Sequence, residues 1–86
     1  MSDRFTELVN RADDRFIQEN IYRVSKTLLA KALKTADPAS RQKILRNMGE
    51  SGAAEMENRI AGLGSIPPEE AEAAQQEIIS MAAPYI

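Results

Sequence analysis

Apolar residues recur along the chain at spacings of three and four residues, and polar residues fill most positions between them. This spacing places the apolar side chains on one face of a helix. No stretch of strand length alternates apolar and polar residues. The pattern predicts an all-α fold with a core formed by Ile17, Ile21, Leu33, Ile44, Leu45, Met48, Met56, Ile60, Leu63 and Ile78.

Candidate helix caps divide the chain into short segments. Asp13, Ser25 and Asp37 each precede a periodic apolar run, and their side chains can accept a hydrogen bond from the first turn. Gly49 and Gly52 are expected to bracket a break between two helices in residues 37–64. Such helices are too short to be stable alone. We therefore expect about six of them in a compact, right-handed superhelical array, an armadillo-like bundle.

The two ends of the chain carry apolar residues. The last helix is expected to follow Pro67 and Pro68, with an apolar stripe of Ala71, Ala74, Ile78, Met81 and Ala82. Tyr85 and Ile86 follow that helix, and Phe5 and Leu8 lie near the start of the chain. Small domains rarely leave such large apolar side chains exposed to water. The ends are expected to pack on each other or to form a weak self-association patch, and the alternative is a frayed tail.

Composition narrows the classes of function. The 86 residues suit a single domain, and a net charge of −2 gives no overall attraction for nucleic acid. Histidine and cysteine are absent from the sequence, and no glycine-rich loop suits phosphate. No apolar run is long enough to insert into a membrane. We expect a cytoplasmic protein that is not an enzyme and needs no cofactor or metal.

Two groups of residues could carry chemistry but have plainer interpretations. Asp13 and Asp14 could be paired carboxylates for acid–base or metal chemistry, yet their place ahead of a helix favours capping. The methionines at positions 48, 56 and 81 favour core filling over a ligand site. Neither group predicts an active site.

Several short sequence motifs are similar to those of one protein family. They are Asp13-Asp14-Arg15, Ala32-Leu33-Lys34, Lys43-Ile44-Leu45, Asn47-Met48, Leu63-Gly64 and Ala74-Gln75-Gln76-Glu77-Ile78. Through them, from about residue 13 to residue 83, the chain resembles the C-terminal domain of the FliG family of flagellar motor switch proteins. By this resemblance, residues 1–11 are the remnant of a hinge or linker helix, residues 12–83 are the core and residues 84–86 are a tail.

The resemblance implies an all-helical domain at the rim of the rotor, peripheral to the inner membrane at the flagellar basal body. Its implied partners are a cytoplasmic loop of the stator and the other switch proteins. The family's contact with the stator relies on a few exposed charges. One basic position is kept as Lys34, a second is Ser51, and the adjacent acidic pair is replaced by Asn58 and Arg59. A further basic position is Pro67.

Three interpretations of function remain open on these residues. The first is a motor-switch interaction module that works through its charged helix face. The second is a scaffold or regulatory relative that keeps the fold and has lost the torque-generating face. A soluble domain of a magnesium transporter is a more distant third. The chain is expected to be either an excised domain or a stand-alone relative.

Overall fold

The computed structural model describes residues 3–82, which form six α-helices and one 3₁₀ turn and contain no strand. In chain order these elements are α1 (Asp3–Arg11), α2 (Asp14–Asn20), η1 (Ile21–Arg23), α3 (Lys26–Lys34), α4 (Pro38–Arg46), α5 (Gly49–Gly62) and α6 (Pro68–Ala82). The prediction of an all-α fold is confirmed. The armadillo-like arrangement stays a prediction.

The three expected N-caps are formed. The side chains of Asp13, Ser25 and Asp37 accept hydrogen bonds from the backbone N–H three residues later, at 2.7, 3.1 and 3.1 Å. Each cap satisfies a backbone donor that has no partner within its helix. The caps therefore start α2, α3 and α4 at the residues that the sequence indicates.

The second helix is short, with seven residues. α2 ends at Asn20, and the chain continues as the 3₁₀ turn η1. The Asn20 side-chain amide donates to the Phe16 carbonyl at 2.9 Å. Side-chain bonds of this kind compete with the backbone ladder of a helix. The turn keeps Ile21 buried while it redirects the chain toward the Ser25 cap.

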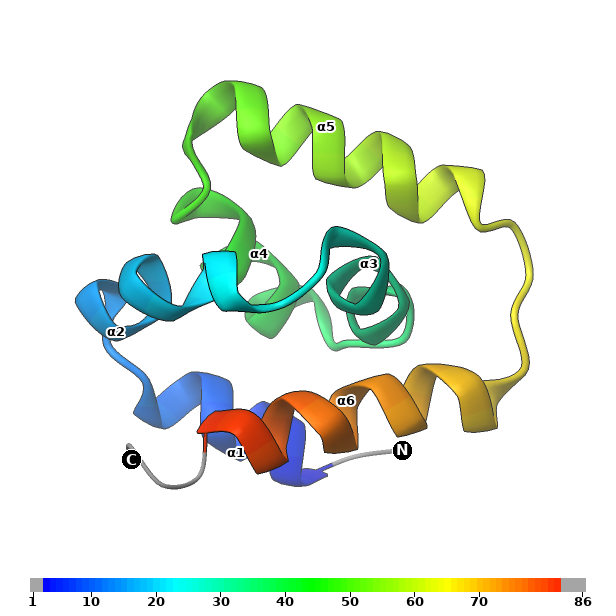
Figure 1. The fold of residues 1–86 in the computed structure, drawn as a ribbon, viewed down its shortest axis with the longest axis horizontal. Helices are drawn as coiled ribbons and strands as arrows, with labels where there is room; N and C mark the ends of the chain where they lie inside the picture. Colours follow the sequence, from blue (N-terminus) through cyan, green and yellow to red (C-terminus); the bar gives the residue numbers. More distant parts are fainter. Residues whose placement is uncertain (1–2, 83–86) are drawn as a thin grey trace.

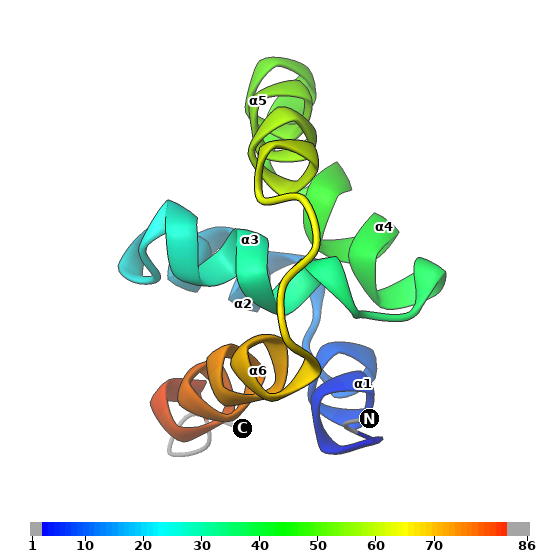
Figure 2. The same ribbon diagram turned by 90° about the vertical axis from the view of Figure 1, so that its right-hand side faces the viewer.

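Helix α3 lies at the centre of the fold, between α5 on one side and α6 on the other (Figures 1 and 2). Ala30, Ala32 and Leu33 are buried almost completely. The small alanine side chains allow close approach of the neighbouring helices. Lys31 and Lys34 are both half-buried because α3 is packed on two sides.

Most residues expected in the core are buried. Ile17, Ile21, Leu33, Ile44, Leu45, Met56 and Ile60 belong to the buried cluster, and Met48, Leu63 and Ile78 are half-buried and pack against it. The core therefore draws on every helix of residues 3–82.

The connection between α4 and α5 differs from the expectation. The break falls at Asn47 and Met48, and α5 begins at Gly49, whose φ of 76° favours glycine. Gly52 lies inside α5, so the expected break there was wrong. A Cβ at position 52 would lie 3.4 Å from the Met48 Cβ, which is ordinary contact. Gly52 keeps a helical backbone, and α5 continues through it.

The buried stripe of α6 is displaced from the predicted one. Met81 was expected in the core but is 41% exposed, and Ile78 is half-buried. Gln75 and Ile79 are buried instead, at 3% and 9% exposure. The Gln75 side chain of α6 faces α3 and makes a polar contact there. The spacing of apolar residues does not reveal such a contact, because Gln75 is polar.

The Gln75 side chain joins α6 to the end of α3. Its amide nitrogen donates to the Ala32 carbonyl at 2.9 Å and to the Thr35 hydroxyl at 3.3 Å. The Ala32 carbonyl belongs to the last turn of α3, where carbonyls lack partners within the helix. A buried carbonyl without a partner is costly. Gln75 therefore acts as a cap supplied by another helix.

Helix α1 is part of the core. It packs against α4 and α6, and Phe5 and Val9 are 1% and 4% exposed. Phe5 is thus covered within the described residues, since α1 packs against α4 and α6. Tyr85 and Ile86 lie outside the described residues, so the expected packing of the two ends on each other stays a prediction.

Asp37 ties α1 to α4. One carboxylate oxygen accepts from the Thr6 hydroxyl at 2.8 Å and from the Ser40 hydroxyl at 2.6 Å, and the other accepts from the Ser40 backbone. The bonds from Ser40, and then that from Thr6, hold the pKa of Asp37 below its ordinary value of 3.8. The charged carboxylate thus stabilises both the cap and the contact between the two helices.

We predict that Gln75→Leu lowers the free energy of unfolding by about 1–3 kcal/mol, because the Ala32 carbonyl stays buried without its donor. The matched control is Gln76→Leu on the exposed side of the same helix, which should change stability by less than about 0.5 kcal/mol. Urea unfolding followed by circular dichroism measures both. Equal effects of the two substitutions would contradict the role given to Gln75.

The stability contributed by Asp37 should depend on pH. Its pKa is lowered in the folded chain, so the unfolded chain binds the proton more readily. The contribution is therefore full above the ordinary value of 3.8 and is lost as the pH falls through the lowered pKa. Asp37→Asn keeps a capping oxygen but removes the charge. The stability difference between the two proteins should shrink on acidification, and a difference that is constant with pH would count against this account.

Candidate functional site

The outward side of α5 is a polar surface that the fold leaves uncovered. α5 packs against α3 and α4, and its opposite side faces away from the other helices (Figures 1 and 2). Met56 and Ile60 form the inner side, at 1% and 2% exposure. Ser51 and Asn58 are exposed and seven residues apart, so they point in nearly the same direction. We call the exposed surface around Ser51, Glu55 and Asn58 the outer face of α5.

The continuity of α5 brings these positions together. A break at Gly52 would have placed Ser51 in a different element from Asn58. Because the helix runs from Gly49 to Gly62 without interruption, both residues lie at the centre of one face. Arg59 is also exposed and flanks this face.

Lys34 lies apart from the other three predicted site residues. It is half-buried in the last turn of α3, a helix that packs beneath α5. Among residues 3–82, no ion pair or hydrogen bond joins Lys34 to Ser51, Asn58 or Arg59. The structure therefore groups three of the predicted positions on α5 and leaves the fourth on a neighbouring helix.

Opposite charges pair with one another around the outer face. The Lys26 ammonium lies 3.1 Å from a Glu55 carboxylate oxygen, and the Arg59 guanidinium lies 3.9 Å from the same oxygen. On the side toward α4, Arg41 lies 3.7 Å from Glu57. The side chains of Lys26 and Glu55 are 60% and 57% exposed, so the attraction is weakened by water. The arrangement compensates charge locally and gives the face no strong single sign.

Sequence reasoning missed part of this network. The four-residue spacing along α5 predicts a pair between Glu55 and Arg59. Arg59 does pair with Glu55 in that way, but the closer partner is Lys26, which is 29 positions distant. No local pattern marks Lys26, because its distance to Glu55 depends on how α3 packs against α5.

The two acidic residues at the start of α2 have structural roles. Asp13 is the cap described above. One Asp14 oxygen accepts from the Arg46 guanidinium at 2.9 Å and from the Asn47 amide at 3.0 Å. The bond from Asn47, followed by that from Arg46, lowers the pKa of Asp14. This carboxylate is thus held ionised as a link between α2 and the end of α4, not as a proton donor.

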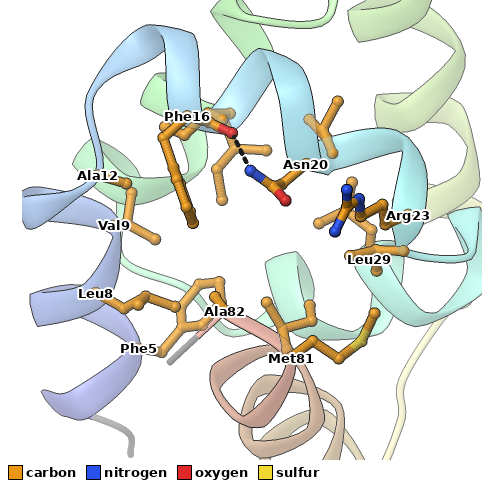
Figure 3. A pocket seen from close by; sticks show the side chains of 15 residues that line it. Phe5, Leu8, Val9, Ala12, Phe16, Asn20, Arg23, Leu29, Met81 and Ala82 are labelled. Carbon is orange, nitrogen blue, oxygen red and sulfur yellow. Dashed lines mark hydrogen bonds between the residues drawn. The ribbon is translucent and has the colours of Figure 1, made fainter. Parts of the chain in front are cut away.

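A second surface feature is an apolar groove between α1, α2, the start of α3 and the end of α6 (Figure 3). Its volume is about 300 Å³. The labelled apolar side chains around it include Leu8, Phe16, Met81 and Ala82, while Asn20 and Arg23 are its polar lining residues. A surface of this kind suits apolar side chains better than charged ligands.

The part of the chain that the structure describes offers no cluster of three acidic side chains placed to hold a metal ion. In the same residues, no helix has the length and apolar character required to cross a bilayer.

Comparison with known proteins gives one consistent result. The model of the FliG C-terminal domain family matches residues 4–85. The flagellar motor switch protein FliG of Vibrio cholerae is 40% identical over 78 residues, which cover 91% of this chain and 22% of that protein. The FliG proteins of Pseudomonas aeruginosa and Thermotoga maritima are 37% and 35% identical, over 81% and 87% of this chain. The chain spans about a fifth of the length of these curated relatives. No solved structure gives a significant match.

Proposed function

The chain belongs to the FliG C-terminal domain family, and we propose that it acts as a protein-binding domain on the rotor side of a flagellar motor switch. The relatives that support this proposal are themselves named motor switch proteins. The structural observation that carries it is the uncovered outer face of α5, where Ser51 and Asn58 stand at positions expected to contact the stator. The proposed partner is a cytoplasmic loop of the stator protein, with the other switch proteins as further partners.

The proposed contact is made by a polar surface and not by unpaired charges. Lys26 and Arg59 both pair with the Glu55 carboxylate, so a charged loop gains little from any one of these exposed charges. Ser51 and Asn58 offer hydrogen-bonding groups without charge. We therefore propose a weak contact whose strength changes little with ionic strength, in contrast to one made by several exposed charges.

Lys34 enters the proposal as a second contact. It retains the basic residue that the resemblance implies, but it lies on α3 and not on α5. A loop that lies across the outer face of α5 must extend to the last turn of α3 to reach it. Lys34 is half-buried, which restricts its ammonium group to fewer directions of approach.

The other interpretations gain no support from an observation. The relatives reported above are motor switch proteins, so a scaffold without a torque-related role is not favoured. Nothing in the fold or the comparisons favours a magnesium transporter. We place the domain at the flagellar basal body, beside the membrane that holds the stator.

We predict that Asn58→Trp weakens binding of the stator loop by about tenfold or more, because the indole blocks the centre of the outer face. The matched control is Ala73→Trp, which adds the same bulk to an exposed position on α6, across α3 from α5. Fluorescence anisotropy of a labelled loop peptide measures binding, and thermal unfolding checks that both variants are folded. Equal binding by the two variants would refute the proposed face.

The same assay tests Lys34. Lys34→Glu should weaken binding if the loop presents an acidic residue to it, and an acid-to-base change in the loop should restore the affinity. If Lys34→Glu leaves the affinity unchanged while Asn58→Trp lowers it, the contact is confined to α5.

A further inference from the structure

A second hollow lies between α4 and α5, along one edge of the outer face. Its volume is about 330 Å³. Gln42, Leu45 and Arg46 line it from α4, and Glu50, Ala53 and Glu57 line it from α5. Glu50 directly precedes Ser51, and Glu57 directly precedes Asn58, so the hollow borders the outer face along α5. We call this hollow the α4–α5 pocket.

The floor of the α4–α5 pocket is apolar and its rim is charged. Leu45 is 4% exposed and Ala53 is half-buried, so hydrocarbon forms the deepest part of the pocket. Arg46, Glu50 and Glu57 are exposed at its rim. A side chain that combines an aliphatic stem with a charged end matches such a surface.

Two of the three charged lining residues are engaged outside the pocket. The Arg46 guanidinium donates to an Asp14 oxygen at 2.9 Å, and a Glu57 oxygen lies 3.7 Å from the Arg41 guanidinium. Within residues 3–82, neither an ion pair nor a side-chain hydrogen bond engages the Glu50 carboxylate. The charge that the pocket leaves uncompensated is therefore negative.

We propose that the α4–α5 pocket binds one lysine or arginine side chain of the partner, with the stem against Leu45 and Ala53 and the charged group at Glu50. This inference rests on the proposed function, because it names the side chain by which a loop on the outer face of α5 is held. Glu50 is not among the positions that the family resemblance selects.

A basic side chain fits the pocket better than an acidic or an apolar one. An acidic side chain meets the carboxylates of Glu50 and Glu57, and it can pair with Arg46 only in competition with Asp14. An apolar side chain covers the floor but removes water from Glu50 without offering a partner. A basic side chain covers the floor with its stem and pairs with Glu50.

A single pair in the pocket agrees with the neutral character of the outer face. Ser51 and Asn58 carry no charge, so the loop gains one attraction at Glu50 and not an array of them. Salt screens a partly enclosed pair less than an exposed pair. The pocket therefore selects which basic residue of the loop docks beside the face, while the whole contact stays weakly dependent on ionic strength.

The test is a double-mutant cycle between Glu50 and the basic residues of the stator loop peptide. Glu50→Gln keeps the size of the side chain and removes its charge, so it should weaken binding of the unmodified peptide by about three- to fivefold. Each basic residue of the peptide is then replaced in turn by glutamine. With one of these peptides, Glu50→Gln should have no further effect. Independent effects with every peptide would overturn the proposal.

The matched control is Glu69→Gln. Glu69 is exposed and is the second residue of α6, as Glu50 is the second residue of α5. The control therefore removes the same charge from the first turn of a helix, where carboxylates interact with the helix dipole. It should leave the affinity for every peptide unchanged. An equal loss of affinity in Glu69→Gln would overturn the proposal, because charge at any helix start would then suffice.

A second variant tests the shape of the pocket while the charge of Glu50 is kept. Ala53→Leu fills the space for the stem and should weaken binding by at least as much as Glu50→Gln, with thermal unfolding as the check that the variant is folded. If Asn58→Trp weakens binding and neither of these variants does, the pocket is refuted while the proposed function stands. If none of the three weakens binding, the proposed function fails and the pocket with it.

Discussion

The packing of the fold depends on hydrogen bonds to the carbonyl groups in the last turn of α3. This helix is packed on two sides, so the carbonyl groups of its last turn cannot all turn to water. The Gln75 amide supplies a donor to the Ala32 carbonyl at 2.9 Å from a different helix. That bond orients α6, buries Ile79 and leaves Met81 beside the groove. The buried polar contact thus lies on the same face of α6 as the buried Ala71 and Ala74.

The outer face of α5 follows from the same packing. α3 and α4 bury Met56 and Ile60, and the helical period then directs Ser51 and Asn58 away from the core. Around them, Lys26 and Arg59 both pair with the Glu55 carboxylate. This surface differs from the several exposed charges that the family resemblance leads one to expect. Shape and neutral hydrogen-bonding groups therefore carry more of the proposed recognition than long-range attraction.

The sequence predicts those parts of the structure that depend on local chemistry. The caps at Asp13, Ser25 and Asp37 were predictable because each satisfies donors within its own turn. The burial of Gln75 was not, because its partner Ala32 lies 43 positions away and amide side chains are usually exposed. The break expected at Gly52 failed because a glycine permits a bend without requiring one.

The candidate site likewise has features that the sequence predicts and features that depend on tertiary contacts. Ser51, Asn58 and Arg59 were identified through a family resemblance, and apolar periodicity alone would not select them. Their common face depends on α5 being continuous through Gly52, which the sequence argued against. Lys26 joins the site only through the packing of α3 against α5. Tertiary contacts thus decide which of the predicted residues act together.

The most direct test of the central claim is to map the partner's contact on the folded chain. Backbone amide NMR spectra recorded during titration with the stator loop peptide report which residues the peptide approaches. Our account predicts that the largest shifts occur at Ser51, Glu55 and Asn58, with smaller ones at the end of α3. Shifts confined to α1, α2 and α6 around the groove would contradict it.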